Sequence, residues 1–411
     1  MLKRIGIKQL RVGMYCSSWV TTSAFVKQAF FINTLDELDQ IIDSGIKEVC
    51  INTNKGLDVL SESGSKPIVK KTVKSALPKK PETADSPAPV SMNEELKQAS
   101  KIVDHSKQAI TSMFNEARMG KAINVENAVS LVEEITSSVM RNPDALIGLA
   151  RLKTKDDYTY MHSVAVCALM VSLSKQLGLS DEHTRESGLA GLLHDVGKMA
   201  IPLDILNNPG KLTDAEFAIV KEHPVAGHKM LLEGGNVGEI SLDVCLHHHE
   251  KMNGTGYPDQ LSGDAISIFA RMGAVCDVYD AITSNRPYKQ GWCPSESLRK
   301  MAEWEGHFDK NIFQAFVKCI GIYPTGTLVR LKSGRLGVVV EQQIGKSLLS
   351  PKVRVFFSSN SKSYITPQLL NLADPNVTDK IITRENAEKW QFHDFNKYWL
   401  GDKAGGQFLT N

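Results

Sequence analysis

The sequence lacks long apolar runs. Its most apolar stretches, such as Val164–Leu173, contain polar residues and are shorter than the roughly 20 residues that span a bilayer. The first twenty residues contain no continuous apolar segment and no small-residue cleavage site, so they do not resemble a signal peptide. We therefore expect a soluble, cytoplasmic protein without a membrane partner.

Paired cysteines and an excess of one charge are also missing. The seven cysteines form no CxxC pair and show no regular spacing, which is typical of reduced thiols in a cytosol. Lys and Arg number 48 against 46 Asp and Glu, so no global field draws the chain to DNA. Any affinity for a nucleotide must come from a local site.

The chain divides by composition into five parts, and its fold class is predicted to be mainly α. Residues 61–93 carry five prolines and no aromatic residue, and such a segment is predicted to be a flexible linker. The other predicted parts are a small α/β regulatory module at 1–60, a helical lead-in at 94–149, a helical catalytic domain at 150–322 and a β-rich C-terminal extension at 323–411.

The spacing of apolar residues predicts the helices and strands of these parts. Residues 14–20, 25–32 and 48–52 are predicted to be strands, with helical spacing at 35–42 between the last two. In the lead-in, Val129, Val132, Ile135 and Val139 form the predicted buried stripe of a helix. The extension shows strand patterns on both sides of a Ser333-Gly334 turn and again from residue 352, followed by a closing helix over 385–399.

Histidine and aspartate side chains recur within apolar helical patterns of the central part. Burying such groups is costly unless they are paired or bind a metal. Their nitrogen and oxygen atoms suit divalent iron, manganese or zinc, and no cysteine stands in a ligand context. The Asp195 carboxylate, next to a histidine, could bridge two ions as in two-metal hydrolases. The predicted ligands are His162, His194, Asp195, His223, His248, His249 and Asp277.

Each of these residues alone has a simpler explanation. His162 could be a hydrogen-bonded core histidine, and Lys198 could be a cation at a helix C-terminus. Arg286 and Lys289 could be a surface pair, and His247 could point away from its neighbours. Their occurrence together, in this order and spacing, favours a metal site.

The same residues resemble the HD-GYP family, a branch of the HD-domain metal-dependent phosphohydrolases. The motifs are His162, HDVGK (194–198), His223-Pro224, HHEKMNGTGYP (248–258) and DVYDAITSNRPYK (277–289). They cover residues 150–322, and the first 60 residues resemble a small module that often precedes HD-GYP domains. The resemblance implies a helical bundle that hydrolyses cyclic di-GMP or 3′,3′-cyclic GMP-AMP to a linear, 5′-phosphorylated dinucleotide.

The resemblance also implies a role for each residue. One ion would be held by His162, His194, Asp195 and Asp277, and a second by His223, His248 and His249, with Asp195 bridging the two ions. Lys198 would lie beside the scissile phosphate, and Arg286 and Lys289 would bind phosphate oxygens. Tyr257 would stand at the mouth of the site, and Asp280, counted among the substrate-binding residues, would orient a neighbouring cation. Glu250 and Asp280 are more simply explained as groups that hold histidine rings or Lys198 in place.

Two positions depart from the family pattern. Relatives with three metals carry a glutamate one helical turn before the first histidine, where this chain has Tyr158. Since a phenol is a poor ligand near neutral pH, we expect two ions, iron or manganese. Asn253 replaces the usual aspartate of the loop that ends in Gly-Tyr-Pro; asparagine keeps the turn-forming chemistry but loses a charge.

Two other functions use the same residue types. A non-enzymatic sensor would bind the dinucleotide without cutting it, but such a protein would lack ligands that are present in this chain. A di-iron oxygenase could use the same ligand set, although Arg286 and Lys289 favour a phosphate. A homodimer, and a signalling protein bound at the Gly-Tyr-Pro loop or the N-terminal module, are the other expected partners.

Overall fold

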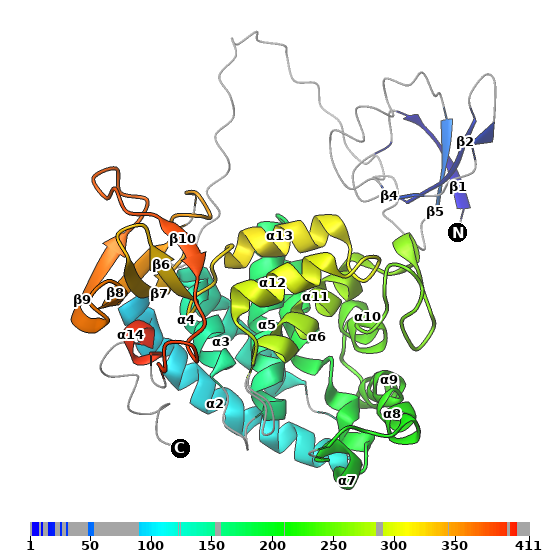
Figure 1. The fold of residues 1–411 in the computed structure, drawn as a ribbon. Coiled ribbons are helices and arrows are strands. Elements are labelled where there is room, and N and C mark those ends of the chain that lie inside the picture. Colours follow the sequence, from blue (N-terminus) through cyan, green and yellow to red (C-terminus); the bar gives the residue numbers. More distant parts are fainter. Residues whose placement is uncertain are drawn as a thin grey trace. The chain divides into compact units, whose positions relative to one another are not determined.

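The computed structural model describes part of the chain: residues 2–7, 10, 15–20, 25–26, 30–31, 48–52, 90–121, 123, 125–152, 158–208, 210–284, 291–343, 345–392 and 395–400. The chain forms two compact units, Met1–Pro81 and Glu82–Asn411. Each unit is described by itself. Helices dominate the described residues, so the expected mainly-α class is confirmed (Figure 1).

The first unit contains an antiparallel sheet with the order β1-β5-β2-β3, in which β4 also pairs with β2. The buried side chains of Ile5, Val49 and Ile51 contribute to its core. The strands expected at 14–20 and 48–52 are confirmed over residues 15–20 and 48–52, the described residues of 25–32 are strand at 25–26 and 30–31, and β1 was not expected. The predicted helix at 35–42 lies outside the described residues. The strands are β1 (Leu2–Gly6), β2 (Tyr15–Val20), β3 (Phe25–Val26), β4 (Phe30–Phe31) and β5 (Glu48–Asn52).

The second unit begins with three helices, α2 (Met92–Arg118), α3 (Glu126–Arg141) and α4 (Pro143–Arg151). A capping box starts α2, because the Ser91 hydroxyl accepts from the backbone N–H of Glu94 and the Glu94 carboxylate accepts from that of Ser91. On α3 the expected buried stripe is confirmed except at Val129, which is 44% exposed. Leu131 is buried instead, since the stripe drifts around the helix with its 3.6-residue period.

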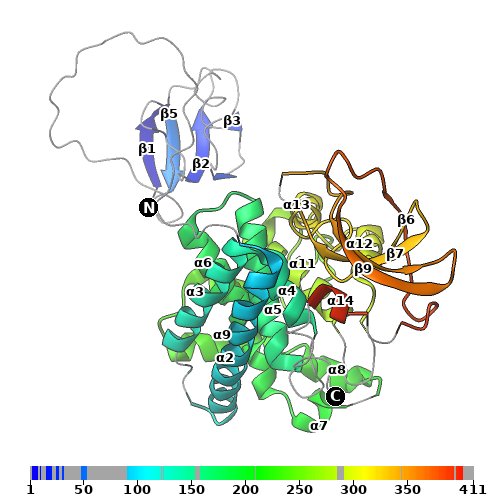
Figure 2. The same cartoon turned by 90° about the vertical axis from the view of Figure 1, so that its left-hand side faces the viewer.

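Helix α5 (Tyr158–Gln176) runs through the centre of this unit. It packs against α4, α6 (Asp181–Leu193), α11 (Ile268–Thr283) and α13 (Lys310–Ile320), and residues 161–174 are buried throughout (Figures 1 and 2). A helix that is apolar on every side belongs in such a position. The remaining elements of the bundle are η2 (Val196–Ala200), α7 (Leu203–Leu206), α8 (Asp214–Val220), α9 (His223–Gly234), α10 (Glu239–His247), η3 (Gly263–Ala265) and α12 (Pro294–Glu303).

A second antiparallel sheet, with strand order β10-β6-β7-β8-β9, follows the helices. Gly334 supports the expected turn with a positive φ of 82°. The sheet is attached to α4, where the Asp144 carboxylate accepts from the Thr325 hydroxyl (2.9 Å) and the Gln342 N–H (2.8 Å). The strands are β6 (Leu328–Leu331), β7 (Arg335–Glu341), β8 (Lys352–Ser358), β9 (Ser363–Asn371) and β10 (Ile381–Arg384).

The predicted closing helix over 385–399 is wrong. Described residues up to Phe392 form turns, and only α14 (Lys397–Leu400) is helical. Gln391 adopts a positive φ of 55°, which interrupts a helix, and Phe392 packs against Phe356 and Phe357 of β8. The aromatic side chains therefore follow the surface of the sheet rather than a helical period. None of the helices in the described residues is both long enough and apolar enough to span a membrane.

Candidate metal centre

The seven predicted ligands come from five segments and meet in the interior of the second unit. His162 lies on α5 and Asp277 on α11, while His223 is the first residue of α9. His248 and His249 directly follow α10. Helix α6 ends at Leu193, His194 and Asp195 occupy the turn after it, and Lys198 lies in η2.

Two glycines bring η2 and α9 close enough for the ligands to meet. A Cβ atom on Gly197 would lie 1.9 Å from the carbonyl oxygen of His223 and 2.4 Å from the backbone nitrogen of Gly227. A Cβ on Gly227 would in turn lie 2.9 Å from the nitrogen of Gly197. Only residues without a side chain fit at this crossing, which places Asp195 and His223 side by side.

Asp195 stands between two groups of histidines. Its Oδ2 atom lies 3.3 Å from His194 Nε2 and 3.4 Å from His162 Nε2. Its Oδ1 atom lies 3.3 Å from His223 Nε2 and 3.8 Å from His248 Nε2. Each carboxylate oxygen therefore faces a different pair of rings, which is the arrangement that a bridging carboxylate requires.

Three of these rings present a bare lone pair to Asp195. The Nδ1 atoms of His194, His223 and His248 lie 2.8, 2.7 and 3.0 Å from the carbonyl oxygens of Gly191, Val220 and Val244. Because a carbonyl can only accept, each Nδ1 carries the hydrogen and each neutral ring has no hydrogen on Nε2.

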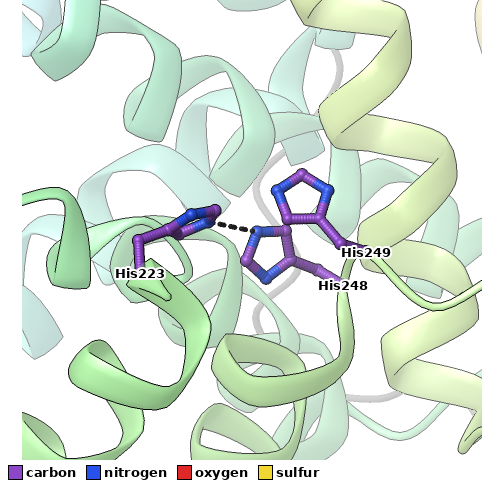
Figure 3. Close-up of side chains that lie close together, drawn as sticks. All are labelled: His223, His248 and His249. Carbon is purple, nitrogen blue, oxygen red and sulfur yellow. Dashed lines mark hydrogen bonds between the residues drawn. The ribbon is translucent and has the colours of Figure 1, made fainter. Parts of the chain in front are cut away.

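No hydrogen-bond donor among the described residues faces these lone pairs. The Nε2 atoms of His223 and His248 face each other at 3.3 Å (Figure 3). Within the part of the chain that the structure describes, His194 Nε2 and Asp195 Oδ1 are buried without a hydrogen-bond partner. Converging acceptors of this kind repel one another unless a cation lies between them, so the site fits divalent metal.

The first donor cluster consists of His162, His194 and Asp277, whose ligand atoms lie within 4.8 Å of one another. His162 Nε2 is 3.0 Å from Asp277 Oδ1, and its Nδ1 is 2.6 Å from Asp280 Oδ2. Burial opposes a charge on this ring, but hydrogen bonds to Asp195, Asp277 and Asp280 raise the pKa of His162 to about 10. A metal cation would replace the proton that these three carboxylates attract.

The second donor cluster consists of His223, His248 and His249, and its ligand atoms also lie within 4.8 Å of one another. Burial lowers the pKa of His249 to about 3 and holds that of His248 well below its usual value. Both rings are therefore neutral near pH 7 and available as ligands. The cluster is the one drawn in Figure 3.

Lys198 and Tyr257 border the centre. Lys198 Nζ lies 2.5 Å from Asp195 Oδ2, and this cation holds the pKa of the Asp195 carboxyl well below its usual value against the effect of burial. The Tyr257 ring stacks on His249 with centroids 4.7 Å apart and planes at 29°. The predicted phosphate contacts Arg286 and Lys289 lie outside the described residues.

Asp280 contacts the Nδ1 atom of His162, on the opposite edge of the ring from the Nε2 atom that faces Asp277. Its side chain is only 3% exposed, and its second carboxylate oxygen accepts from the Ser284 hydroxyl at 3.1 Å. Its place among the substrate-binding residues stays a prediction, whereas the geometry favours its other predicted role, which is to hold a histidine ring. Carboxylates bonded to the outer nitrogen of a ligand histidine fix its orientation and raise its basicity.

Residues 250–263, which follow the ligand pair His248 and His249, form the GYP loop. Asn253 Oδ1 accepts from the N–H and the hydroxyl of Thr255, at 3.1 and 2.7 Å, so the turn chemistry expected of Asn253 is confirmed. Glu250, expected to hold a histidine ring or Lys198, instead accepts from the Asp259 N–H at 2.7 Å. Nothing in the sequence pattern indicated this contact within the loop.

His247 points away from both donor clusters, the alternative that its sequence position left open. Its Nδ1 lies 2.8 Å from Asp243 Oδ1 and its Nε2 lies 3.1 Å from Asp259 Oδ2. Neither ring nitrogen is free to bind a metal.

Profiles of known families match two parts of this chain. The profile described as an HD domain matches residues 137–312, which include all the residues of both donor clusters and Asp195. A profile described as a domain of unknown function (DUF3391) matches residues 2–128, which include strands β1 to β5 and helix α2.

Similar proteins are found among curated sequences and solved structures. A Pseudomonas aeruginosa protein named cyclic di-GMP phosphodiesterase is 52% identical over 414 residues, 100% of this chain and 98% of that protein. A Vibrio cholerae protein named 3′3′-cGAMP-specific phosphodiesterase 1 is 32% identical over 190 residues, 46% of this chain and 42% of that protein. An HDG"Y"P protein structure from Bdellovibrio bacteriovorus has a TM-score of 0.46 at 17% identity, covering 77% of this chain and 99% of that chain.

Proposed function

Because this chain belongs to the HD-GYP family of HD-domain phosphodiesterases, we propose that it hydrolyses cyclic di-GMP, with 3′,3′-cyclic GMP-AMP as the alternative substrate. The order of the two substrates follows the extent of the similarity. The relative named for cyclic di-GMP matches the full length of this chain, and the relative named for cGAMP matches 46% of it.

The position of Asp195 between two histidine clusters is the observation that carries this proposal. We assign one ion to His162, His194 and Asp277 and the other to His223, His248 and His249, with Asp195 shared. The nitrogen and oxygen donors suit iron or manganese. Bound in these positions, divalent ions supply Lewis-acid chemistry, which withdraws charge from a phosphoryl group and makes water a better nucleophile near neutral pH.

The protein's own residues then orient the substrate and stabilise charge. The ammonium group of Lys198, next to Asp195, stabilises negative charge as it develops on the phosphoryl oxygens. Tyr257, stacked on His249, forms a flat apolar wall against which the dinucleotide rests. Arg286 and Lys289 are proposed to bind phosphate oxygens.

The reaction is the hydrolysis of one phosphodiester bond. A water oxygen forms a bond to phosphorus, the bond from phosphorus to the 3′ oxygen breaks, and the departing 3′ oxygen takes up a proton. The product is a linear dinucleotide with a 5′-phosphate and a free 3′-hydroxyl. No serine or cysteine nucleophile is needed.

The test is to incubate the full chain, loaded anaerobically with Fe(II) or Mn(II), with each cyclic dinucleotide separately and to identify products by chromatography. We expect linear dinucleotide from cyclic di-GMP at the higher rate. Tight binding without product would instead establish a sensor. Dioxygen consumption without phosphodiester cleavage would establish an oxygenase.

A further inference from the structure

We infer that His247 is a positioning residue, which fixes the GYP loop, and with it Tyr257, against the metal centre. This inference rests on the proposed hydrolysis, because it assigns Tyr257 to substrate binding. His247 is the last residue of α10 and directly precedes His248 and His249. It is therefore placed to connect the second donor cluster to the GYP loop.

Two carboxylates bind the His247 ring from its two edges. Asp243, one turn earlier on α10, lies 2.8 Å from Nδ1, and Asp259 of the GYP loop lies 3.1 Å from Nε2. Each ring nitrogen lies at hydrogen-bond distance from a carboxylate oxygen, so the ring connects α10 to the GYP loop. The side chain of His247 is 15% exposed, which limits competition from water.

Asp259 is held twice. Its side chain accepts from His247, and its backbone N–H donates to the buried carboxylate of Glu250 at 2.7 Å. His247 and Glu250 flank the ligand pair His248 and His249, so the loop is attached on both sides of that pair. Tyr257 lies two residues before Asp259, and its ring stacks on that of His249. The backbone N–H of Tyr257 also donates to the backbone carbonyl oxygen of His249, at 3.3 Å.

The other carboxylate connects His247 to the first donor cluster. Asp243 Oδ2 accepts from the hydroxyl of Ser267, which in turn accepts from the N–H of Ala270 at 3.0 Å and caps α11. Helix α11 carries Asp277. A continuous set of hydrogen bonds thus connects the GYP loop with α10 and α11, the elements that present His248, His249 and Asp277.

The experiment compares His247→Phe, Asp259→Asn and the double variant in the metal-loaded full chain. Phenylalanine keeps the shape of the ring without its donors, and Asp259, 54% exposed, can be changed without disturbing the core. We expect each single variant to raise KM for cyclic di-GMP by about three- to tenfold, with kcat within about twofold and metal content unchanged. The double variant should raise KM no further than His247→Phe alone, because Asp259→Asn removes only the charge of a hydrogen bond that His247→Phe already removes.

Hydrogen exchange supplies a readout that does not depend on activity. Amides of residues 251–263 should exchange faster in His247→Phe and Asp259→Asn than in the wild type. His105→Phe is the matched control: it removes an exposed pair with Glu134, 3.2 Å away, between α2 and α3, and should change neither exchange of the loop nor KM.

Unchanged exchange of the loop in both single variants would overturn the inference, as would faster exchange with an unchanged KM. A loss of kcat with constant KM would also overturn it, because that result describes general damage to the fold. Absence of hydrolysis in the wild type would remove the proposed function, while the exchange data would still show whether His247 holds the loop.

Discussion

At the scale of single residues, the centre depends on a carboxylate whose two oxygens serve different clusters. Asp195 Oδ2 faces His162 and His194, and Oδ1 faces His223 and His248. A terminal ligand such as His249 belongs to one cluster only. The consequences of removing these two residues should therefore differ in kind.

We predict that Asp195→Ala loses both ions and leaves less than about 1% of the activity, because each ion loses its shared ligand. Elemental analysis and product chromatography measure the two effects. His249→Ala is the comparison and should retain one ion per chain. An Asp195→Ala protein with two ions and near-normal turnover would contradict the assignment.

Asp280 allows a test of one cluster alone, because it contacts the ring nitrogen of His162 that is not a predicted metal ligand. Its Oδ2 atom lies 2.6 Å from His162 Nδ1. We predict that Asp280→Asn weakens metal affinity about 10- to 100-fold at the first donor cluster and leaves the second unchanged. Competition with a chelator measures both affinities. Glu134→Gln, a similar change next to the exposed His105, is the control, and equal affinities in the two variants would refute the role of Asp280.

The sequence identified the ligands better than their supporting contacts. His and Asp within apolar helices are detectable because burying them without a partner is costly. The bond from Asp280 to His162 joins residues 118 positions apart, and the bond from His247 to Asp259 depends on the path of a loop. Neither contact leaves a periodic signal, since each is set by how the elements pack.

At the scale of elements, the crossing of η2 and α9 determines whether the two clusters can share Asp195. We predict that Gly197→Ala lowers the free energy of unfolding by at least about 1–3 kcal/mol and reduces metal content, because its Cβ would lie 1.9 Å from the carbonyl oxygen of His223. Thermal unfolding and elemental analysis measure these losses.

Gly238→Ala is the matched control for this substitution. Its Cβ would meet only Glu186 Oε1, at 3.6 Å, which is an ordinary contact. Its effect on stability should stay within about 1 kcal/mol, the range of N-cap preferences. Equal stability and metal content in the two variants would mean that the close crossing does not constrain the centre.

The sequence predicted the type of a helix or strand correctly where a single hydrophobic pattern dominated the segment. The apolar length of α5 and the alternation of the later strands gave their type, while the closing segment over 385–399 was mistaken for a helix. Its aromatic residues are spaced for packing on β8, where Phe392 contacts Phe356 with centroids 5.2 Å apart. From the sequence alone, apolar residues at helical spacing in a short segment cannot be distinguished from aromatic residues whose spacing is set by packing on a sheet.

At the scale of the whole molecule, metal binding should contribute to stability. Three bare ring nitrogens converge on Asp195, so the metal-free protein keeps unfavourable contacts in its interior. Binding to the native state at 100 times the dissociation constant adds about 2.7 kcal/mol per ion. We predict that Mn(II) raises the Tm of chelator-stripped protein in calorimetry and has no such effect on Asp195→Ala. An equal rise in both proteins would indicate binding elsewhere.

The number and position of the metals test the central claim most directly. Anomalous scattering from crystals of the metal-loaded wild type should show two peaks per chain. One should lie among His162, His194 and Asp277, the other among His223, His248 and His249, with Asp195 contacting both. A single peak, or peaks away from Asp195, would contradict the shared-carboxylate centre. A third well-occupied peak would contradict the two-ion count inferred from Tyr158.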